Sequence, residues 1–316
     1  MSQLLSLPPV DGVEVTTIMD NSIDLLMAST AVARRFPLKQ DFFSRHQLRA
    51  EHGASQLITV INEGKRSTIL FDTGVSPDGA LHNIDVMGID LSGIQAIVLS
   101  HGHADHTQGM YGLLDKLGTR RMPIVLHPDA FLKRRLVLND NQIIEMPAPS
   151  LHDLEREGVE LLVERGPSFL INGTLLVTGQ IERTTTFEMG MKTQQAKIDG
   201  EWQPDPWIYD DQAIIVNVRD KGLVVITGCG HAGIINILRM ARAQTGVEQI
   251  YAVLGGFHLT GALFEPIIPP TIDALQEIKP TVIVPAHCTG WRATQRIAQV
   301  MPDAYTPNSV GTTFVL

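Results

Sequence analysis

Three histidines and one aspartate fall within six residues of the chain, in the segment SHGHADHT at positions 100–107. His101 and His103 are two residues apart, so in an extended segment their imidazoles point the same way. Asp105 and His106 follow where the chain turns, and can face a second position nearby. Imidazole nitrogens and carboxylate oxygens are ligands that zinc, iron, manganese and nickel take. The spacing therefore predicts a site for one or two divalent metal ions.

An apolar run over residues 94–99, IQAIVL, comes directly before these side chains. Its length and β-branched content predict a buried strand, which places the ligands on the loop that leaves its C-terminal end. Hydrolytic two-metal sites hold their ions roughly 3.5–4 Å apart, and one loop of this kind can serve both ions. The competing interpretation is a polar loop whose histidines only make hydrogen bonds.

Three later apolar runs are also each followed, within a few residues, by a histidine. These runs and their histidines are 222–227 with His231, 251–254 with His258, and 281–284 with His287. Open α/β sheets gather their sites at such strand ends, so we expect these histidines to join the first loop. Cys229 precedes His231 and has a rival interpretation as a small buried hydrophobe, and His258 as a core histidine. The histidines without such a setting are interpreted as surface or structural: His46, His52, His82, His127 and His152.

The order of the elements predicts the fold class. Hairpin patterns at 57–71 and 212–227 precede a regular alternation of strands and helices over the C-terminal third. This order favours an α/β (α+β) protein with two mixed sheets and helices on the outer faces. A helix is also expected at about 129–138, where Lys133, Arg134 and Arg135 would form a solvated face.

We expect one domain over residues 1–316. Two stretches with little periodicity, at about 22–50 and 184–211, are predicted to be excursions that cover the site. The chain has 44% apolar and 19% charged residues, which is typical of a globular protein.

The net charge of −9 argues against nucleic acid or an anionic membrane as partner. Bound divalent cations would still attract a small anionic substrate. The sequence lacks an apolar run long enough to span a membrane, a basic start typical of a signal peptide, and enough cysteines for a disulfide framework. The expected location is therefore the cytoplasm. The sequence leaves the oligomeric state open, a homo-oligomer included.

The tetrapeptide FDTG at 71–74, followed by HGHADH at 101–106, resembles the metallo-β-lactamase superfamily. The signature of that superfamily is His-x-His-x-Asp-His on the loop after a central strand, preceded by an Asp-x-Gly turn. The resemblance implies a four-layer αββα sandwich with a one- or two-metal site at the sheet edge. Five further motifs are similar to a branch that contains dihydropterin–ribofuranosylaminobenzene phosphate synthases and related metal-dependent hydrolases. These motifs are DN at 20–21, EHGAS at 51–55, GCGHAG at 228–233, GGFHL at 255–259 and HCTG at 287–290.

The resemblance implies a division of the ligands between two metals. His101 and His103 would hold the first, and the second would be held by Asp105, His106 and His287. Cys229 stands where many relatives place a bridging aspartate in Thr-Gly-Asp. Zinc is the expected ion, with iron or manganese as the alternatives.

The chain departs from the pattern at the third ligand of the first metal. Relatives supply a histidine after a Pro-Gly pair, but here Thr178-Gly179 is followed by Gln180, a poor zinc ligand. The candidates that can replace it are His231, Glu182 and His258.

The resemblance also implies catalytic and supporting roles. Metals of this kind lower the pKa of a bound water to roughly 7, and Asp105 would orient that water and accept its proton. Asp72 would brace the ligand loops as a hydrogen-bond acceptor. The candidate residues for gripping a phosphate or carboxylate of the substrate are Glu182, Arg183, Thr184 and His258.

Three functions are compatible with these residues. The favoured one is a metal-dependent hydrolase of a small phosphoester, lactone or thioester, because activated water is the least demanding use of such a site. The second is a transferase that condenses a dihydropterin diphosphate with a ribofuranosyl-aminobenzene phosphate. The third is a metal-containing binding or redox-sensing protein without hydrolytic activity.

Overall fold

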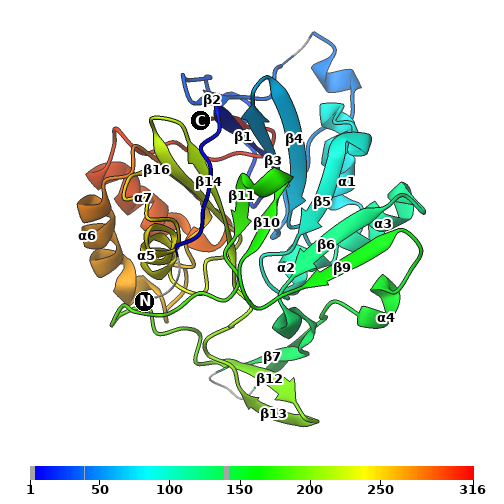
Figure 1. The fold of residues 1–316 in the computed structure, drawn as a ribbon, viewed down its shortest axis with the longest axis vertical. Coiled ribbons are helices and arrows are strands. Elements are labelled where there is room, and N and C mark those ends of the chain that lie inside the picture. Colours follow the sequence, from blue (N-terminus) through cyan, green and yellow to red (C-terminus); the bar gives the residue numbers. More distant parts are fainter. Residues whose placement is uncertain (1–3, 39, 139–141) are drawn as a thin grey trace.

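Two large mixed β-sheets stand face to face in the computed structural model, which describes residues 4–38, 40–138 and 142–316 (Figure 1). The eight-stranded sheet has, in spatial order, β2 (Ala33–Arg34), β18 (Thr313–Val315), β1 (Gly12–Met19), β3 (Ser55–Asn62), β4 (Lys65–Phe71), β5 (Ile94–Val98), β6 (Met122–Leu126) and β9 (Val159–Val163). The six-stranded sheet has β10 (Ser168–Leu170), β11 (Leu175–Val177), β14 (Ala213–Val218), β15 (Gly222–Thr227), β16 (Ile250–Gly256) and β17 (Val282–Ala286).

The parallel part of each sheet determines where the site can form. Strands β4, β5, β6 and β9 run parallel to one another, as do β15, β16 and β17. Parallel neighbours have their carboxyl ends at the same edge of the sheet. The segments that follow β15, β16 and β17 therefore start side by side, and each carries one of the histidines singled out above.

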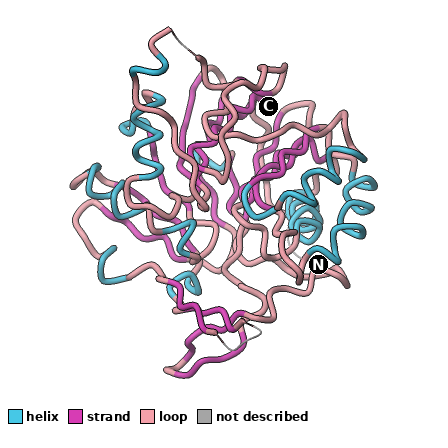
Figure 2. The backbone as a smooth tube through the Cα atoms, turned by 180° about the vertical axis from the view of Figure 1, so that it is seen from behind, coloured by secondary structure: helices cyan, strands magenta, loops and turns pink. Residues whose placement is uncertain are grey.

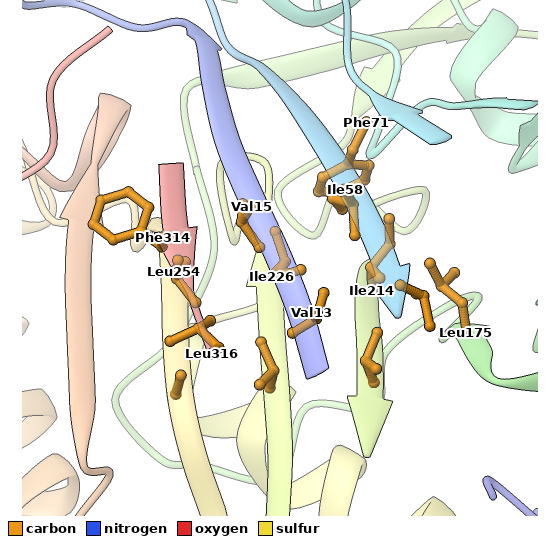
Figure 3. Packing of buried hydrophobic residues seen from close by; sticks show 14 of the residues in the cluster. Val13, Val15, Ile58, Phe71, Leu175, Ile214, Ile226, Leu254, Phe314 and Leu316 are labelled. Atoms are coloured by element: carbon orange, nitrogen blue, oxygen red, sulfur yellow. The ribbon is translucent and has the colours of Figure 1, made fainter. Parts of the chain in front are cut away.

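Alternation along the strands forms the core between the sheets. In β4, Ile69 and Phe71 face the second sheet, whereas Leu70 between them packs under the helices on the other side. In β15, Val224 and Ile226 face the first sheet in the same way. Figure 3 shows the two inner faces interdigitating, with Val13, Val15, Ile58 and Phe71 opposite Leu175, Ile214, Ile226 and Leu254. Because successive side chains of a strand point to opposite faces, β4 contributes both to the core between the sheets and to the layer under the helices.

Helices cover the two outer faces of the sandwich, as the view from behind makes plain (Figure 2). The eight-stranded sheet is covered by α1 (Gly79–Met87) and α3 (Met110–Leu117), with the short helices α2 (Ala104–Thr107) and α4 (Leu151–Leu154) nearby. The six-stranded sheet is covered by α5 (Ile234–Thr245), α6 (Ile268–Ile278) and α7 (Trp291–Val300). The predicted αββα sandwich is confirmed.

A third, four-stranded sheet was not expected from the sequence. It pairs β13 (Glu201–Pro204), β12 (Gln194–Ile198), β7 (Arg134–Val137) and β8 (Ile143–Met146), and projects at the bottom of Figure 1. The helix predicted at 129–138 is wrong, because its second half is strand β7 and pairs with β12. Arg134 is buried rather than solvated. The excursion at 184–211 is thus partly strand.

The described part of the chain contains no helix with the length and apolar character needed to cross a bilayer.

Candidate metal centre

The loop that carries the HGHADH motif leaves β5 and is held by hydrogen bonds from three directions. Ser100 N donates to Asp72 Oδ1 at 2.7 Å, and Gly102 N donates to Asp210 Oδ2 at 2.7 Å. Gln212 N donates to the carbonyl of Ser100. A Cβ on Gly102 would lie 2.2 Å from the carbonyl oxygen of Ala130, so only glycine fits there. The sequence therefore fixes the loop before any ligand binds.

One group of donor atoms brings His101 and His231 together with Cys229. Their donor atoms all lie within 4.8 Å of one another. His103 joins this group, because its Nδ1 lies 3.1 Å from His231 Nε2. His101 Nε2 is buried and has no hydrogen-bond partner among the described residues. A buried nitrogen without a partner is rare in native proteins, and a ligand that binds there would satisfy it.

A second group of donor atoms surrounds Asp105. Its Oδ2 lies 3.2 Å from His287 Nε2 and 3.6 Å from His106 Nε2. His106 Nε2 in turn lies 3.1 Å from Cys229 Sγ. The donor atoms of all four side chains lie within 4.8 Å of one another. Cys229 is common to both groups, so its sulfur stands between them.

These spacings suit ligands of a shared metal ion. Tetrahedral coordination with bonds of about 2.0–2.1 Å to nitrogen separates two ligand atoms by about 3.3 Å. The separations between His103 and His231 and between His287 and Asp105 are 3.1 and 3.2 Å. Histidine, carboxylate and thiolate together form a donor set that divalent transition metals bind. The residues present therefore fit the metal pair that the motif implied.

The second ring nitrogen of four histidines is hydrogen-bonded outside the centre. The pairs are His101 Nδ1 with Ser100 Oγ (2.8 Å), His103 Nε2 with Gln194 Oε1 (2.9 Å), His106 Nδ1 with Asp72 Oδ2 (2.7 Å) and His287 Nδ1 with Asn21 Oδ1 (3.1 Å). Such partners fix the tautomer and the ring orientation of a ligand histidine. Each ring is thereby held with one particular nitrogen toward the centre.

Asp72 makes the bracing contacts expected of it. Its carboxylate accepts hydrogen bonds from Ser100 N, Ser100 Oγ and His106 Nδ1, and it is buried. The backbone of Asp72 has φ +60°, in the left-handed region where aspartate and asparagine are tolerated better than most residues. The Asp-x-Gly turn thus ties the end of β4 to two parts of the ligand loop.

The protonation states of the metal-free histidines differ between the two groups. Burial lowers the pKa of His101 and His231 well below the usual value, and burial together with Arg134 lowers the pKa of His103 to about 4. Burial also works against charge on His106, but the carboxylates of Asp72 and Asp105 outweigh it and raise its pKa to about 9. The first group is therefore neutral and ready to bind a metal near pH 7, whereas His106 must first lose a proton.

Sequence reasoning missed two side chains at the centre. His52, interpreted as surface or structural, stacks on His287 with ring centroids 5.0 Å apart, and its Nε2 lies 3.7 Å from Asp105 Oδ2. Its side chain is 71% exposed, so it stands at the mouth of the site. Gln194, in the excursion, contacts His103. The motif EHGAS contains His52 and could have indicated its role, whereas no local sequence pattern indicates Gln194.

In the segment proposed to bind substrate, residues 182–184, two of the residues make hydrogen bonds to other parts of the protein. Arg183 donates to the carbonyls of Ile181, Trp207 and Ile208. Thr184 N donates to Asn236 Oδ1, and Glu182 is exposed. The contacts of Arg183 and Thr184 favour structural roles for both residues.

His258 has a different setting, since it and His231 line a cavity of about 230 Å³. Apolar side chains dominate its walls and the exposed Lys192 stands at its rim; the apolar residues are Phe187, Met189, Phe257, Leu259, Leu263, Phe264 and Ile267. The cavity therefore opens directly beside the first group of donors.

Three features define the class of protein: the four layers, the loop after β5, and the metal-donor side chains at the strand ends. The model of the metallo-beta-lactamase superfamily matches residues 53–242, and the chain belongs to that superfamily. Its fold is that of Tm1679, a metal-dependent hydrolase of the beta-lactamase superfamily, with a TM-score of 0.73, 24% identity, and coverage of 96% of this chain and 98% of that one.

Two proteins of Methanocaldococcus jannaschii are similar to the chain in sequence. One is 7,8-dihydropterin-6-methyl-4-(beta-D-ribofuranosyl)-aminobenzene-5'-phosphate synthase, 31% identical over 257 residues, which are 77% of this chain and 83% of the synthase. The other is an uncharacterised protein, 31% identical over 260 residues, which are 81% of this chain and 91% of that protein. Superfamily membership implies divalent metal binding, which agrees with the donor groups described above.

Proposed function

We propose that the chain is a metal-dependent hydrolase that uses activated water on a small phosphoester, lactone or thioester. The observation that carries this proposal is the meeting of donors from the loop after β5 with donors from the ends of β15 and β17. The proposed ligands of the first ion are His101, His103 and His231, those of the second are Asp105, His106 and His287, and Cys229 stands between the two ions. Zinc is the proposed ion.

A divalent metal pair held there supplies Lewis acidity and lowers the pKa of bound water to roughly 7, which makes a nucleophile available at neutral pH. The protein contributes orientation. Asp105 Oδ2 lies 3.2, 3.6 and 3.7 Å from nitrogens of His287, His106 and His52, and these contacts support a role for this carboxylate in orienting a water and accepting its proton. Exposed His52 is placed to meet a substrate that approaches from solvent.

The cavity beside His231 supports a choice of substrate. Its volume of about 230 Å³ suits a small organic group rather than a polymer, and its apolar walls suit the part of the substrate that does not react. Lys192 at the rim offers a positive charge to a phosphate or carboxylate. A small anionic substrate fits these features, although the chain as a whole is acidic.

A transferase that condenses a dihydropterin diphosphate with a ribofuranosyl-aminobenzene phosphate is the second candidate, because one relative with 31% identity is named 7,8-dihydropterin-6-methyl-4-(beta-D-ribofuranosyl)-aminobenzene-5'-phosphate synthase. In that reaction the amino nitrogen of the aminobenzene would replace water as the nucleophile, a C–N bond would form as the C–O bond to the diphosphate breaks, and the nitrogen would lose a proton. An aromatic ring would also fit the apolar cavity. The hydrolase and the transferase would use the same site and differ only in the group that attacks the substrate.

A single assay separates the candidates. Protein loaded with zinc is given a panel of phosphoesters, lactones and thioesters, and separately the dihydropterin diphosphate with and without the aminobenzene riboside phosphate. Turnover of one ester class that a chelator abolishes is the expected result. Product that needs both aromatic substrates, without ester hydrolysis, would favour the transferase. Inertness toward every substrate, together with iron in the protein purified without added metal, would favour the binding or redox-sensing protein.

A further inference from the structure

Cys288 and His258 lie against the metal centre but belong to neither of its two donor groups. The donor atoms of Cys229, His258 and Cys288 all lie within 4.8 Å of one another. They follow β15, β16 and β17, which are adjacent parallel strands. A third group of donors therefore exists at the same edge of the six-stranded sheet, and it shares Cys229 with the other two groups.

The two cysteines share a space that a glycine keeps open. Both are buried, and Cys288 Sγ donates to the carbonyl of Cys229 at 3.2 Å. A Cβ on Gly256 would lie 2.7 Å from Cys288 Sγ and 3.0 Å from Cys229 Cα. Any other residue at this position would push the cysteines away. Strand β16 thus ends in a glycine where the thiols must approach it.

His258 has two features that its packing does not explain. Its φ is +43°, in the left-handed region that residues other than glycine seldom adopt. Its Nδ1 is buried and has no hydrogen-bond partner among the described residues. The ring lies between His231 and Phe264, with centroids 4.2 and 4.4 Å away. Strained residues with unpaired polar atoms are concentrated at ligand sites, where binding compensates for both.

We propose that Cys229, Cys288 and His258 hold a third metal ion, a soft cation of the zinc class, beside the catalytic pair. Two thiolates and one imidazole are the donors that such cations prefer. On binding, each thiol loses its proton to solvent as a metal–sulfur bond forms, and no electron is transferred. Cys229 belongs to all three donor groups, so its thiolate would keep lone pairs available for the catalytic pair.

The third ion would join the segments that follow three strands. It would hold the ring of His258, which lines the cavity beside His231, and it would fix the turn around Cys288. The third ion would thus stabilise the wall of the cavity beside His231. Its binding would not depend on which reaction the metal pair performs. If the protein proves not to be a hydrolase, the proposal of a third ion is unaffected. If the third ion is not found, the hydrolase proposal is unaffected.

Cadmium is a suitable probe, because it binds thiolate and imidazole ligands as zinc does and its bonds to thiolate absorb in the ultraviolet. Metal-free, reduced protein is titrated with cadmium, and bound ions and the thiolate absorption are measured together. We expect three ions per chain and an absorption that reflects two sulfur ligands. Cys288→Ser is expected to bind one ion fewer and to lose about half of the absorption.

A second variant keeps the test informative where Cys288→Ser does not fold. His258→Asn removes the imidazole but retains a residue that tolerates the left-handed backbone conformation. This variant is expected to release one cadmium ion to a competing chelator before the other two. Circular dichroism checks the fold of both variants.

Three results would overturn the proposal. One is a wild-type protein that binds only two cadmium ions, and another is a Cys288→Ser variant with undiminished ion count and absorption. The third is a disulfide between Cys229 and Cys288 in the loaded protein, seen as a mass lower by two hydrogens. Turnover of His103→Ala, measured separately, reports on the catalytic pair alone.

Discussion

His103 Nδ1 lies 3.1 Å from His231 Nε2, although 128 residues separate the two histidines in the chain. The opposite nitrogen of His103 is bonded to Gln194 Oε1 at 2.9 Å, so the ring can present only Nδ1 to the centre. Gln194 lies at the start of β12, in the small sheet that the sequence did not predict. An excursion from the sandwich therefore sets the orientation of a candidate ligand.

Gln194→Leu is expected to weaken zinc binding by about 10–100-fold, because the ring of His103 loses the partner that fixes its tautomer. Competition with a chromogenic chelator measures the affinity. Gln195→Leu is the matched control, since Gln195 Oε1 accepts its hydrogen bond from Arg135 in the same strand pair rather than from a candidate ligand. Equal affinities for the two variants would refute the orienting role.

Asp105→Asn is expected to lower hydrolytic turnover by about 10²–10⁴-fold, the range for loss of a general base. The amide can still occupy the position but cannot accept a proton from water. Steady-state kinetics at saturating zinc, with bound metal measured in parallel, separates this effect from loss of the ion. A variant with bound metal and turnover within a factor of a few of wild type would exclude Asp105 as the base.

Arg134 forms buried ion pairs with Asp205 (2.8 Å) and Asp210 (2.6 Å), and Asp210 also accepts from Gly102 in the ligand loop. Arg134→Ala leaves two buried carboxylates without their cation, so we expect a loss of about 3–5 kcal/mol in the free energy of unfolding. Denaturant titration of the metal-free protein measures it.

The exposed pair of Arg165 with Asp129 is the matched control for Arg134. Arg165→Ala removes the same type of side chain, but solvent screens this pair, so the expected loss is below about 1 kcal/mol. A similar loss for both variants would show that the buried pairs have no special role.

Glu188 predicts a dependence of stability on pH. It is buried and accepts from Ile235 N and Asn236 N, at the start of α5. Burial raises its pKa above the usual value, although these backbone N–H groups and Thr185 oppose the shift. A carboxyl with a raised folded pKa binds its proton more tightly when folded. Its contribution is therefore full below the unfolded pKa and is lost as pH rises through the folded one.

The difference in unfolding free energy between wild type and Glu188→Gln isolates this contribution from other titrating groups. We expect the advantage of wild type to decline as pH rises from about 4.5, the usual pKa of a glutamate. Denaturant titrations over a pH series, with chelator present, measure the difference. An advantage that grows with pH would mean that the carboxyl is stabilised in its charged form.

The sequence predicted the parts of the site that local patterns encode. Apolar strands that end in His101, His231 and His287 are visible as runs of β-branched residues followed by ligands, and β5, β15 and β17 lie where expected. The rule that parallel strands share an edge predicts that the segments after β15 and β17 lie together, whereas the loop after β5 comes from the other sheet and meets them across the sandwich. Cys229 and Asp72 followed from motifs that resemble a known superfamily.

What the sequence did not reveal depends on long-range partners. The local sequence predicts a solvated helix face for Arg134, because its partners Asp205 and Asp210 are about 70 residues away in the chain. No local pattern indicates a buried ion pair. The third ligand candidate of the first ion could not be chosen among His231, Glu182 and His258. The spacing of His231 from His103 favours His231.

If distant segments meet to bind metal, removing the imidazole of His103 should lower the metal content of the protein. Protein purified without added metal is analysed for elements beside His152→Ala, which changes an exposed histidine on α4. We expect bound divalent metal in wild type and His152→Ala, and a clear loss in His103→Ala with unchanged circular dichroism. Equal metal content in all three proteins would contradict it.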